Sequence, residues 1–282
     1  MKKVIIIDSH AILHRTFHAL PPLLNKEGKP TGAIYGFLLL FLRLLKEFKP
    51  DFIIAAFDYP APTFRYKKYK QYKAQRKKGP PELYDQINET KKMLQVLKIK
   101  IYEKKGFEAD DIIATLVKLC SAKKLETIII SGDLDVLQLV NKKTKAYILK
   151  TGIKQAVLYD EQEVEKKYHG LGPKQLVDFR ALRGDASDNI PGVPGIGEKT
   201  AIKLLKKYGS LENVLKKEPL KKDIALLSKE LAKLKNNVII NFDLTKCSEV
   251  LLKKEKLIKL LEQKGFDSLV KRLNNTENLK LF

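Results

Sequence analysis

Short apolar runs alternate with amphipathic stretches over the first half of the chain, a pattern typical of α/β proteins. The spacing predicts helices at 32–48, 82–97 and 108–120, with Thr31 as the N-cap of the first. It predicts strands between and around them, at 4–7, 52–57, 98–103, 127–130 and 145–149. Strands separated by helices pair in parallel through right-handed crossovers. We therefore expect a parallel sheet flanked by helices.

The pattern changes near residue 160, where Lys/Leu-rich helical stretches begin and continue to the end of the chain. A Gly/Pro-rich segment, DASDNIPGVPGIGEKTA at 185–201, interrupts them. We expect two domains, an α/β core over 1–175 and an α-helical domain over 176–282.

The net charge of the chain indicates what kind of partner it binds. Lys and Arg number 55 against 33 acidic residues, so the formal net charge is +22. The alternative is a lysine-rich surface without a binding role, as in some thermophile proteins. Those proteins favour both lysine and glutamate, whereas here the number of glutamates does not match the number of lysines. The imbalance favours a polyanionic partner, either nucleic acid or an anionic membrane surface. No apolar run approaches the roughly 20 residues of a membrane span. Cys120 and Cys247 are isolated, which indicates a reduced, cytoplasmic, soluble protein.

Acidic residues stand where the predicted strands end. Asp8, Asp58 and Asp133 each follow a strand, and the carboxyl ends of parallel strands share one edge of the sheet. The DLDV motif with Asp133 and Asp135 leaves three alternatives by itself: the nucleophile and acid of an aspartyl phosphatase, a metal site, or a helix N-cap. The acids Glu108, Asp110 and Asp111 open a helix near the same edge, although acids in a first turn also simply complement the helix dipole.

Together these carboxylates favour a metal centre. So many acids cannot all stay ionised at one edge without compensation, and oxygen-only ligands suit Mg²⁺ or Mn²⁺. Two such ions can activate water and stabilise the leaving oxygen in phosphoryl chemistry. His10, His14 and His18 share one helical face, for which we expect mixed packing rather than a metal.

The segment 65–78, RYKKYKQYKAQRKK, has eight basic residues and no acid. Tyr66, Tyr69 and Tyr72 recur every third position and would form a drifting stripe if the segment is helical. Charge runs are usually solvated loops. Tyrosines among cations are, however, what single-stranded nucleic acid needs, because bases stack on the rings while cations contact phosphates.

The glycine-rich stretch PGVPGIGEKTA, 191–201, lies between two helical patterns. Gly195 and Gly197 allow close backbone approach, and the next helix can direct N–H groups at a phosphate. A plain turn between helices is the alternative, but the stretch resembles the helix–hairpin–helix motif that holds duplex DNA. Asp185 and Asp188 just before it would complete a second metal position.

Six segments carry a resemblance over residues 4 to about 205: IIIDSHAILHRTFHAL, AAFDYPAPTFR, YKAQRKKGPPEL, GFEADDIIATL, SGDLDVLQLV and LRGDASDNIPGVPGIGEKTA. In this order they resemble the 5′ nuclease (flap endonuclease) family, and most closely the bacterial 5′–3′ exonuclease domain of DNA polymerase I. The resemblance implies a PIN-like core, a helical arch at 62–82 that admits a 5′ single strand, and a helix–hairpin–helix-type (H3TH) domain with its hairpin motif at 185–201.

The resemblance also implies roles for individual residues. Lys73 and Arg76 would orient and stabilise the scissile phosphate. The metal-binding acids would be Asp8, Glu108, Asp110, Asp111, Asp133, Asp135, Asp185 and Asp188, with Asp58 part of the acidic site. A potassium ion at the hairpin would be held by carbonyls of Leu182, Arg183, Pro191, Val193 and Ile196. Further DNA contacts would come from Arg65, Tyr69, Lys70, Tyr72, Lys77, Gly192, Gly195, Ile196, Gly197, Lys199 and Thr200.

We therefore predict a 5′–3′ exonuclease and flap endonuclease dependent on Mg²⁺, with Mn²⁺ as a substitute and two ions bound. Its substrate would be DNA with a 5′ single strand or RNA primer next to duplex, in replication and repair. We expect a cytoplasmic monomer that acts away from membranes, alongside a separate DNA polymerase. No polymerase follows Phe282, which leaves a stand-alone enzyme or a fragment. The rival functions are a catalytically silent DNA-binding module and a smaller PIN-like ribonuclease.

Overall fold

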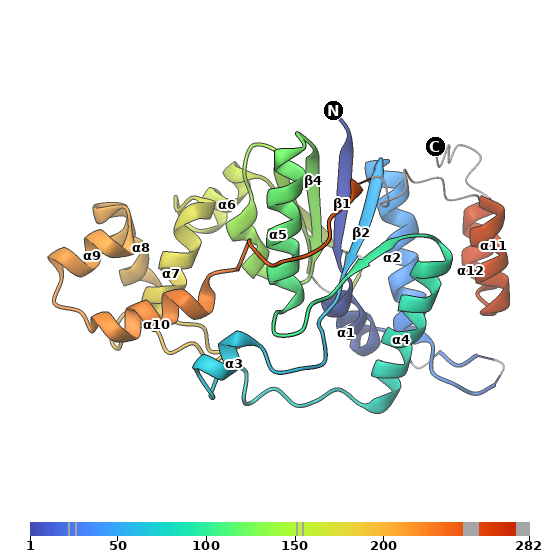
Figure 1. The fold of residues 1–282 in the computed structure, drawn as a ribbon, viewed down its shortest axis with the longest axis horizontal. Coiled ribbons are helices and arrows are strands. Elements are labelled where there is room, and N and C mark those ends of the chain that lie inside the picture. Colours follow the sequence, from blue (N-terminus) through green and yellow to red (C-terminus); the bar gives the residue numbers. More distant parts are fainter. Residues whose placement is uncertain (22, 26, 151, 154, 245–253, 275–282) are drawn as a thin grey trace.

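A computed structural model describes residues 1–21, 23–25, 27–150, 152–153, 155–244 and 254–274. A six-stranded sheet in the order β3-β2-β1-β4-β5-β6 lies at its centre (Figure 1). The first five strands pair in parallel, as the sequence predicts, whereas β6 runs antiparallel to β5 and was not predicted. The strands are β1 (Lys3–Asp8), β2 (Phe52–Ala56), β3 (Lys100–Tyr102), β4 (Glu126–Ser131), β5 (Thr144–Leu149) and β6 (Ala156–Tyr159).

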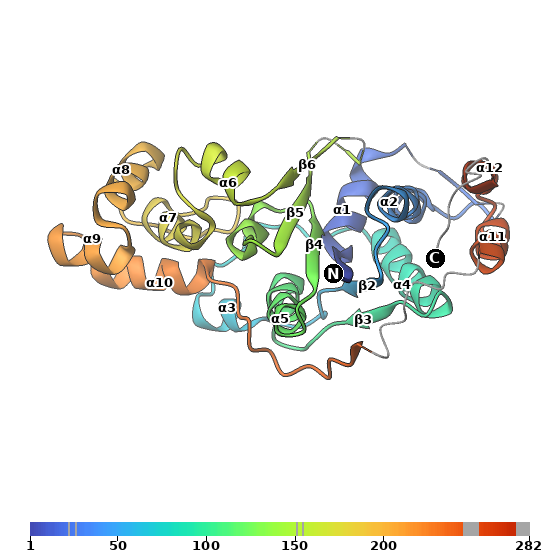
Figure 2. The same ribbon diagram turned by 90° about the horizontal axis from the view of Figure 1, so that it is seen from above.

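Helices cover both faces of the sheet. Successive side chains of a strand point to opposite faces. Ile5 and Ile7 of β1 pack with helices α1 (Ser9–Ala19), α2 (Gly32–Phe48) and α4 (Pro81–Val96), whereas Val4 and Ile6 pack with α5 (Ala109–Ala122). Figure 2 shows α5 on the opposite side of the strands from α2 and α4. Burial on both faces explains why β1 is continuously apolar.

The N-terminus of α2 is capped from another helix. The Gln86 side chain on α4 accepts a hydrogen bond from the Ala33 N–H at 2.8 Å, and the Thr31 hydroxyl donates to the Leu23 carbonyl at 3.2 Å. Thr31 is the N-cap residue of α2, as predicted, although its side chain makes no capping hydrogen bond to the helix.

A helical unit follows the sheet and has an apolar core of its own, built around Phe179, Leu182, Leu205 and Val214. Its hairpin joins α7 to α8, as predicted. Among the described residues, none of the helices has both the length and the hydropathy needed to span a bilayer. The unit comprises α6 (Glu161–Lys167), α7 (Leu176–Arg183), α8 (Glu198–Tyr208), α9 (Leu211–Lys217) and α10 (Lys222–Ala232), with a short 3₁₀ turn at Pro173–Gln175.

The chain then returns to the α/β core instead of extending the helical unit. The Val238 N–H donates to the Thr115 hydroxyl of α5 at 3.1 Å. Helices α11 (Lys254–Gln263) and α12 (Asp267–Asn274) bury leucines in the cluster of α2 and α4, at the opposite end of the molecule from α8 and α9 (Figure 1). The structure thus differs from the prediction of a single helical domain over 176–282. Cys247 and residues 275–282 lie outside the described residues.

Candidate active site

The acids that follow the strands meet at the carboxyl edge of the sheet, as expected. Their backbones are fixed by parallel strand pairing, which aligns the ends of β1, β2 and β4. Together with the first turn of α5 they line one cavity of about 710 Å³. The acids in its wall are Asp8, Asp58, Glu108, Asp110 and Asp133.

Asp8 lies at the bottom of this group and is only 3% exposed. Its carboxylate accepts hydrogen bonds from the Ser131 hydroxyl at 2.6 Å and from the Ala11 N–H at 3.1 Å, and so caps α1. Burial raises the pKa of Asp8 to about 7, and repulsion from Asp58 and Asp133 acts in the same direction. A positive charge placed beside Asp8 would stabilise the ionised form of its carboxyl group.

Asp110 is the second strongly perturbed acid. Its Oδ1 is buried and has no hydrogen-bond partner within the described residues. Burial raises the pKa of Asp110 well above its usual range, with further contributions from Asp8, Asp133 and Asp135. A buried acceptor without a partner requires a reason, and a bound cation would supply one.

The donor set therefore fits a hard divalent cation, because it consists of carboxylate oxygens at one edge. Over the part of the chain that the structure describes, however, no three Asp, Glu, His or Cys side chains stand close enough to hold an ion as they are. Basic side chains compensate the acids instead, and they come from two places, the arch and α7.

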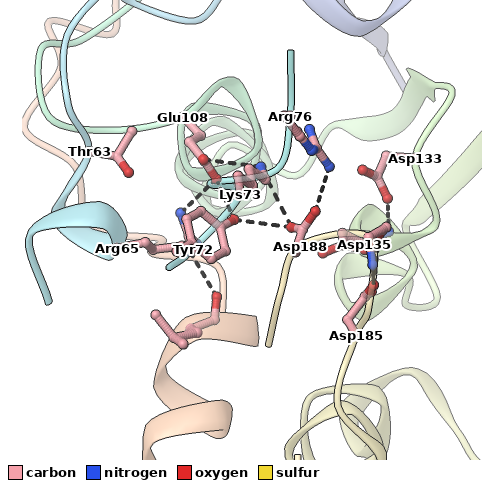
Figure 3. Close-up of polar contacts among 12 residues, drawn as sticks. Thr63, Arg65, Tyr72, Lys73, Arg76, Glu108, Asp133, Asp135, Asp185 and Asp188 are labelled. Atoms are coloured by element: carbon pink, nitrogen blue, oxygen red, sulfur yellow. Dashed lines mark hydrogen bonds and ion pairs between the residues drawn. The ribbon is translucent and has the colours of Figure 1, made fainter. Parts of the chain in front are cut away.

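The arch supplies Lys73 and Arg76 (Figure 3). The Lys73 ammonium lies 3.1 Å from Glu108 Oε1 and 3.6 Å from Asp188 Oδ2, and the Arg76 guanidinium donates to Asp188 Oδ1 at 2.5 Å. Burial would lower the pKa of Lys73, but Glu108, Tyr72 and Asp188 outweigh it and raise the pKa well above its usual value. Both cations therefore stay charged beside the acids.

Arg180 on α7 compensates two acids outside the cavity wall, Asp135 and Asp185. It pairs with Asp135 and lies 3.8 Å from Asp185 Oδ2, while Asp133 Oδ1 accepts the Asp135 N–H at 2.9 Å. Burial opposes ionisation of Asp133, but the hydrogen bonds from Asp135 and the charges of Arg180 and Lys73 outweigh it and lower its pKa. Arg180 was not predicted. A signal existed, since it occupies an inward position beside Phe179 on an amphipathic helix.

Arg65 and Asp111 form a buried ion pair, so two predicted roles need correction. Their side chains are 1% and 0% exposed, and the guanidinium donates to both Asp111 oxygens at 2.8 Å. Arg65 also donates to the carbonyls of Leu231 and Lys233, and the Lys235 N–H donates to Asp111. Arg65 offers no surface to DNA, and Asp111 has no oxygen directed at the cavity. The pair joins the arch, α5 and the end of α10.

The arch is less helical than predicted. Its helix α3 covers only Phe64–Lys68, and a turn follows in which Lys73 has a φ of 53°. The predicted tyrosine stripe does not form, because Tyr72 is 4% exposed and its hydroxyl lies 3.1 Å from both Glu108 Oε2 and Asp188 Oδ2. Tyr72 therefore cannot stack on bases in this conformation. Tyr69 is partly exposed, and Lys70 and Lys77 are exposed as expected.

The hairpin presents a different set of groups than expected. Gly192 is buried, has a φ of 65° and donates its N–H to the Ser228 hydroxyl at 3.0 Å, so it is structural rather than a DNA contact. An added Cβ there would lie 2.3 Å from the Gly184 nitrogen. Ile196 is partly buried. The exposed predicted contacts at the start of α8 are Gly195, Gly197, Lys199 and Thr200.

Of the residues predicted to hold potassium, Leu182 and Arg183 end α7, whereas Pro191, Val193 and Ile196 lie in the hairpin itself, before α8. Two of their carbonyls already accept hydrogen bonds, since the Leu182 carbonyl receives the Val193 N–H at 2.7 Å and the Val193 carbonyl receives the Ile196 N–H at 3.0 Å. Arg183 and Pro191 are exposed.

The histidines of α1 line the cavity rather than packing into the core. His10 and His14 have ring centroids 4.7 Å apart, and His10 Nε2 lies 3.5 Å from Asp58 Oδ2. Burial, followed by the neighbouring His10, lowers the pKa of His14 to about 4, so this ring is neutral at physiological pH.

Two known protein families match successive parts of the chain. Residues 3–169 match the family described as 5′-3′ exonuclease, N-terminal resolvase-like domain. Residues 171–255 match 5′-3′ exonuclease, C-terminal SAM fold. The division near residue 170 agrees with the start of the helical core at Leu171.

Individual relatives are longer or similar in length. DNA polymerase I of Bacillus subtilis is 40% identical over 284 residues, which cover 96% of this chain and 32% of that protein. The 5′-3′ exonuclease of Aquifex aeolicus is 43% identical over 216 residues, covering 77% of this chain and 73% of that protein. The chain thus spans about a quarter to a third of the length of the polymerase I relatives that it matches.

Solved structures share the fold over almost the entire chain. The T5 D15 protein co-crystallised with metal ions has a TM-score of 0.64 at 19% identity, covering 98% of this chain and 100% of that one. The catalytic core of Rad2 in complex with DNA has a TM-score of 0.61 at 19% identity, covering 96% and 93%.

Proposed function

Because the chain belongs to the 5′-3′ exonuclease family, we propose that it is a divalent-metal-dependent nuclease that cuts DNA where a 5′ single strand joins duplex. It acts as a 5′–3′ exonuclease and as a flap endonuclease. The observation that carries this proposal is the carboxylate cavity beneath a basic arch, with the buried Asp110 oxygen left without a partner in the described structure.

The acids would hold Mg²⁺, or Mn²⁺ in its place, in two groups. One group is Asp8, Asp58, Glu108, Asp110 and Asp133. The other is Asp135, Asp185 and Asp188. Bound ions would activate water and stabilise the leaving oxygen. Asp111 stays outside both groups, because Arg65 occupies its oxygens.

Lys73 and Arg76 are the residues that would contact the scissile phosphate. They compensate Glu108 and Asp188 in the free protein. When cations neutralise those carboxylates, the two side chains become free to pair with the phosphate and to stabilise the negative charge that develops on it. The arch thus carries cations that exchange an acidic partner for the substrate.

Contacts to the rest of the DNA would be mainly electrostatic. Lys70 and Lys77 of the arch would follow the single strand, with Tyr69 beside them. Gly195, Gly197, Lys199 and Thr200 at the start of α8 would hold duplex phosphates, where backbone N–H groups and the helix dipole favour an anion. A potassium ion would sit at the hairpin carbonyls. We further propose a cytoplasmic monomer that works with a separate DNA polymerase in replication and repair.

A flap substrate labelled at the 5′ end, incubated with and without Mg²⁺, tests the proposal directly. We expect short labelled products with Mg²⁺ alone, cut near the junction. Asp133→Asn should abolish cleavage while leaving flap binding largely intact. Tight binding without cleavage by the unaltered protein would instead identify a catalytically silent DNA-binding module. Equal turnover by Asp133→Asn would remove the metal role of that residue.

A further inference from the structure

The arch turn, residues 71–76, is attached to the acid loop, residues 185–190, which leads into the hairpin. The Lys73 N–H donates to the Asp188 carbonyl at 3.0 Å. Two side-chain amides reach across in opposite directions: Asn189 Nδ2 donates to the Gln71 carbonyl at 2.8 Å, and Gln75 Nε2 donates to the Ala186 carbonyl at 2.9 Å. We call this set of contacts the latch.

An apolar cluster lies under the latch. Tyr72 of the arch turn packs with Ile190 of the acid loop and with Leu231 and Ala232 of α10. All four are at most 4% exposed. The latch therefore buries apolar surface as well as forming hydrogen bonds, which makes it a specific attachment rather than a chance contact of two loops.

The latch determines where the arch cations stand. Lys73 has a φ of 53° and Asn189 one of 57°, so each occupies the left-handed region that a side chain rarely adopts without support from its surroundings. Lys73 and Arg76 extend from this turn to Glu108 and Asp188. If the turn were released, both cations would move away from the cavity together.

We propose that Gln75 and Asn189 are positioning residues, which hold the arch turn so that Lys73 and Arg76 reach the scissile phosphate. The acid loop closes with reciprocal hydrogen bonds between Asp185 and Ile190 and continues into the hairpin. Duplex held at the hairpin is thereby coupled to the arch turn. This inference rests on the proposed nuclease function for its catalytic part, whereas the latch itself can be tested without cleavage.

Two variants weaken the latch by removing one of its side-chain amides each, with little other change. Gln75→Ala removes an exposed amide. Asn189→Gly removes the other and keeps a residue that tolerates positive φ. Gln95→Ala on α4 is the matched control for Gln75→Ala, since Gln95 is also exposed and lies outside the arch and the acid loop. Limited trypsin digestion, with cut sites read by mass spectrometry, should show several-fold faster cleavage after Arg76 and Lys77 in both latch variants only.

Single-turnover cleavage at saturating enzyme gives the second readout. Each latch variant should slow the chemical step by about tenfold, the loss of roughly one hydrogen bond, with the Kd for flap DNA unchanged. In a variant that already carries Lys73→Ala and Arg76→Ala, the latch substitutions should not slow cleavage further, because the two cations that the latch positions are absent. A general loss of folding would slow both backgrounds alike.

The outcomes separate the latch from the proposed function. Unchanged digestion of the arch in both variants would overturn the latch, whether or not the protein cuts DNA. An equal slowing in the background without the two cations would overturn the positioning role. Absence of flap cleavage by the unaltered protein, with faster digestion of the arch in the variants, would overturn the nuclease function and leave the latch standing.

Discussion

Replacing Arg65 with methionine should strongly destabilise the protein, because it leaves Asp111 buried without its cation. The Arg65 guanidinium donates to both Asp111 oxygens at 2.8 Å, and the carboxylate is fully buried. Removing one partner of a buried ion pair typically costs about 3–5 kcal/mol. The carbonyls of Leu231 and Lys233 lose a donor as well. At about 2–4 °C per kcal/mol for a protein of roughly this size, the melting temperature should fall by at least about 6 °C.

The control lies on the same helix. Lys68 pairs with Glu230, and both side chains are more than a third exposed. Lys68→Met should therefore change the free energy of unfolding by no more than about 1 kcal/mol. Differential scanning calorimetry or urea titration of the two variants measures the difference. A double variant, Arg65→Met with Asp111→Asn, should lose less than the sum of its single variants. If Arg65→Met were as stable as Lys68→Met, the buried pair would have no structural role.

Three further results are expected. Burial raises the pKa of Asp8 to about 7 from an ordinary 3.8, so the folded protein holds a proton that the unfolded chain has lost. Asp8 should therefore make the metal-free protein lose up to about 1.4 kcal/mol per pH unit between pH 4 and 7, and Asp8→Asn should remove that contribution from the pH dependence of thermal melts. Mg²⁺ at 100 times its Kd should add about 2.7 kcal/mol, seen as a higher melting temperature that Asp110→Asn reduces; a melting curve indifferent to Mg²⁺ would contradict the metal site. Lys73→Ala with Arg76→Ala should slow single-turnover cleavage by about 10²–10³-fold, and an effect confined to Kd would contradict their role.

Local pattern was enough to predict the five parallel strands of the sheet. β1, β2, β4 and β5 are short apolar runs buried on both faces, and the helices between them carry clear periodicity. The parallel order then brought Asp8, Asp58 and Asp133 to one edge, because the carboxyl ends of parallel strands must coincide. β6 was not predicted; only one of its four residues is buried, so it lacks the buried apolar run that marks the central strands, and it pairs antiparallel with β5 at the edge of the sheet.

Contacts between distant segments could not be predicted in the same way. The sequence shows eight basic residues in the arch but not which of them face inward. Arg65 is buried because Asp111 and the end of α10 surround it, and Tyr72 is buried because Ile190 and Leu231 cover it. The burial of Arg65 and Tyr72 depends on the positions of α10 and the acid loop. The sequence of residues 65–78 contains no information about those positions.

The sequence alone determined that the parallel strands share one edge, which acids follow those strands, and that the basic segment 65–78 comes soon after Asp58. Each of these follows from local periodicity and from residue types within short motifs, whereas the arch was implied by the resemblance to the 5′ nuclease family. Tertiary structure decided which charges pair. Asp111 and Asp110 are neighbours on one helix turn, yet one is held by Arg65 and the other has an oxygen without a partner in the described residues. A carboxylate becomes structural or available for a cation according to what the rest of the chain packs against it, and only the folded molecule fixes that.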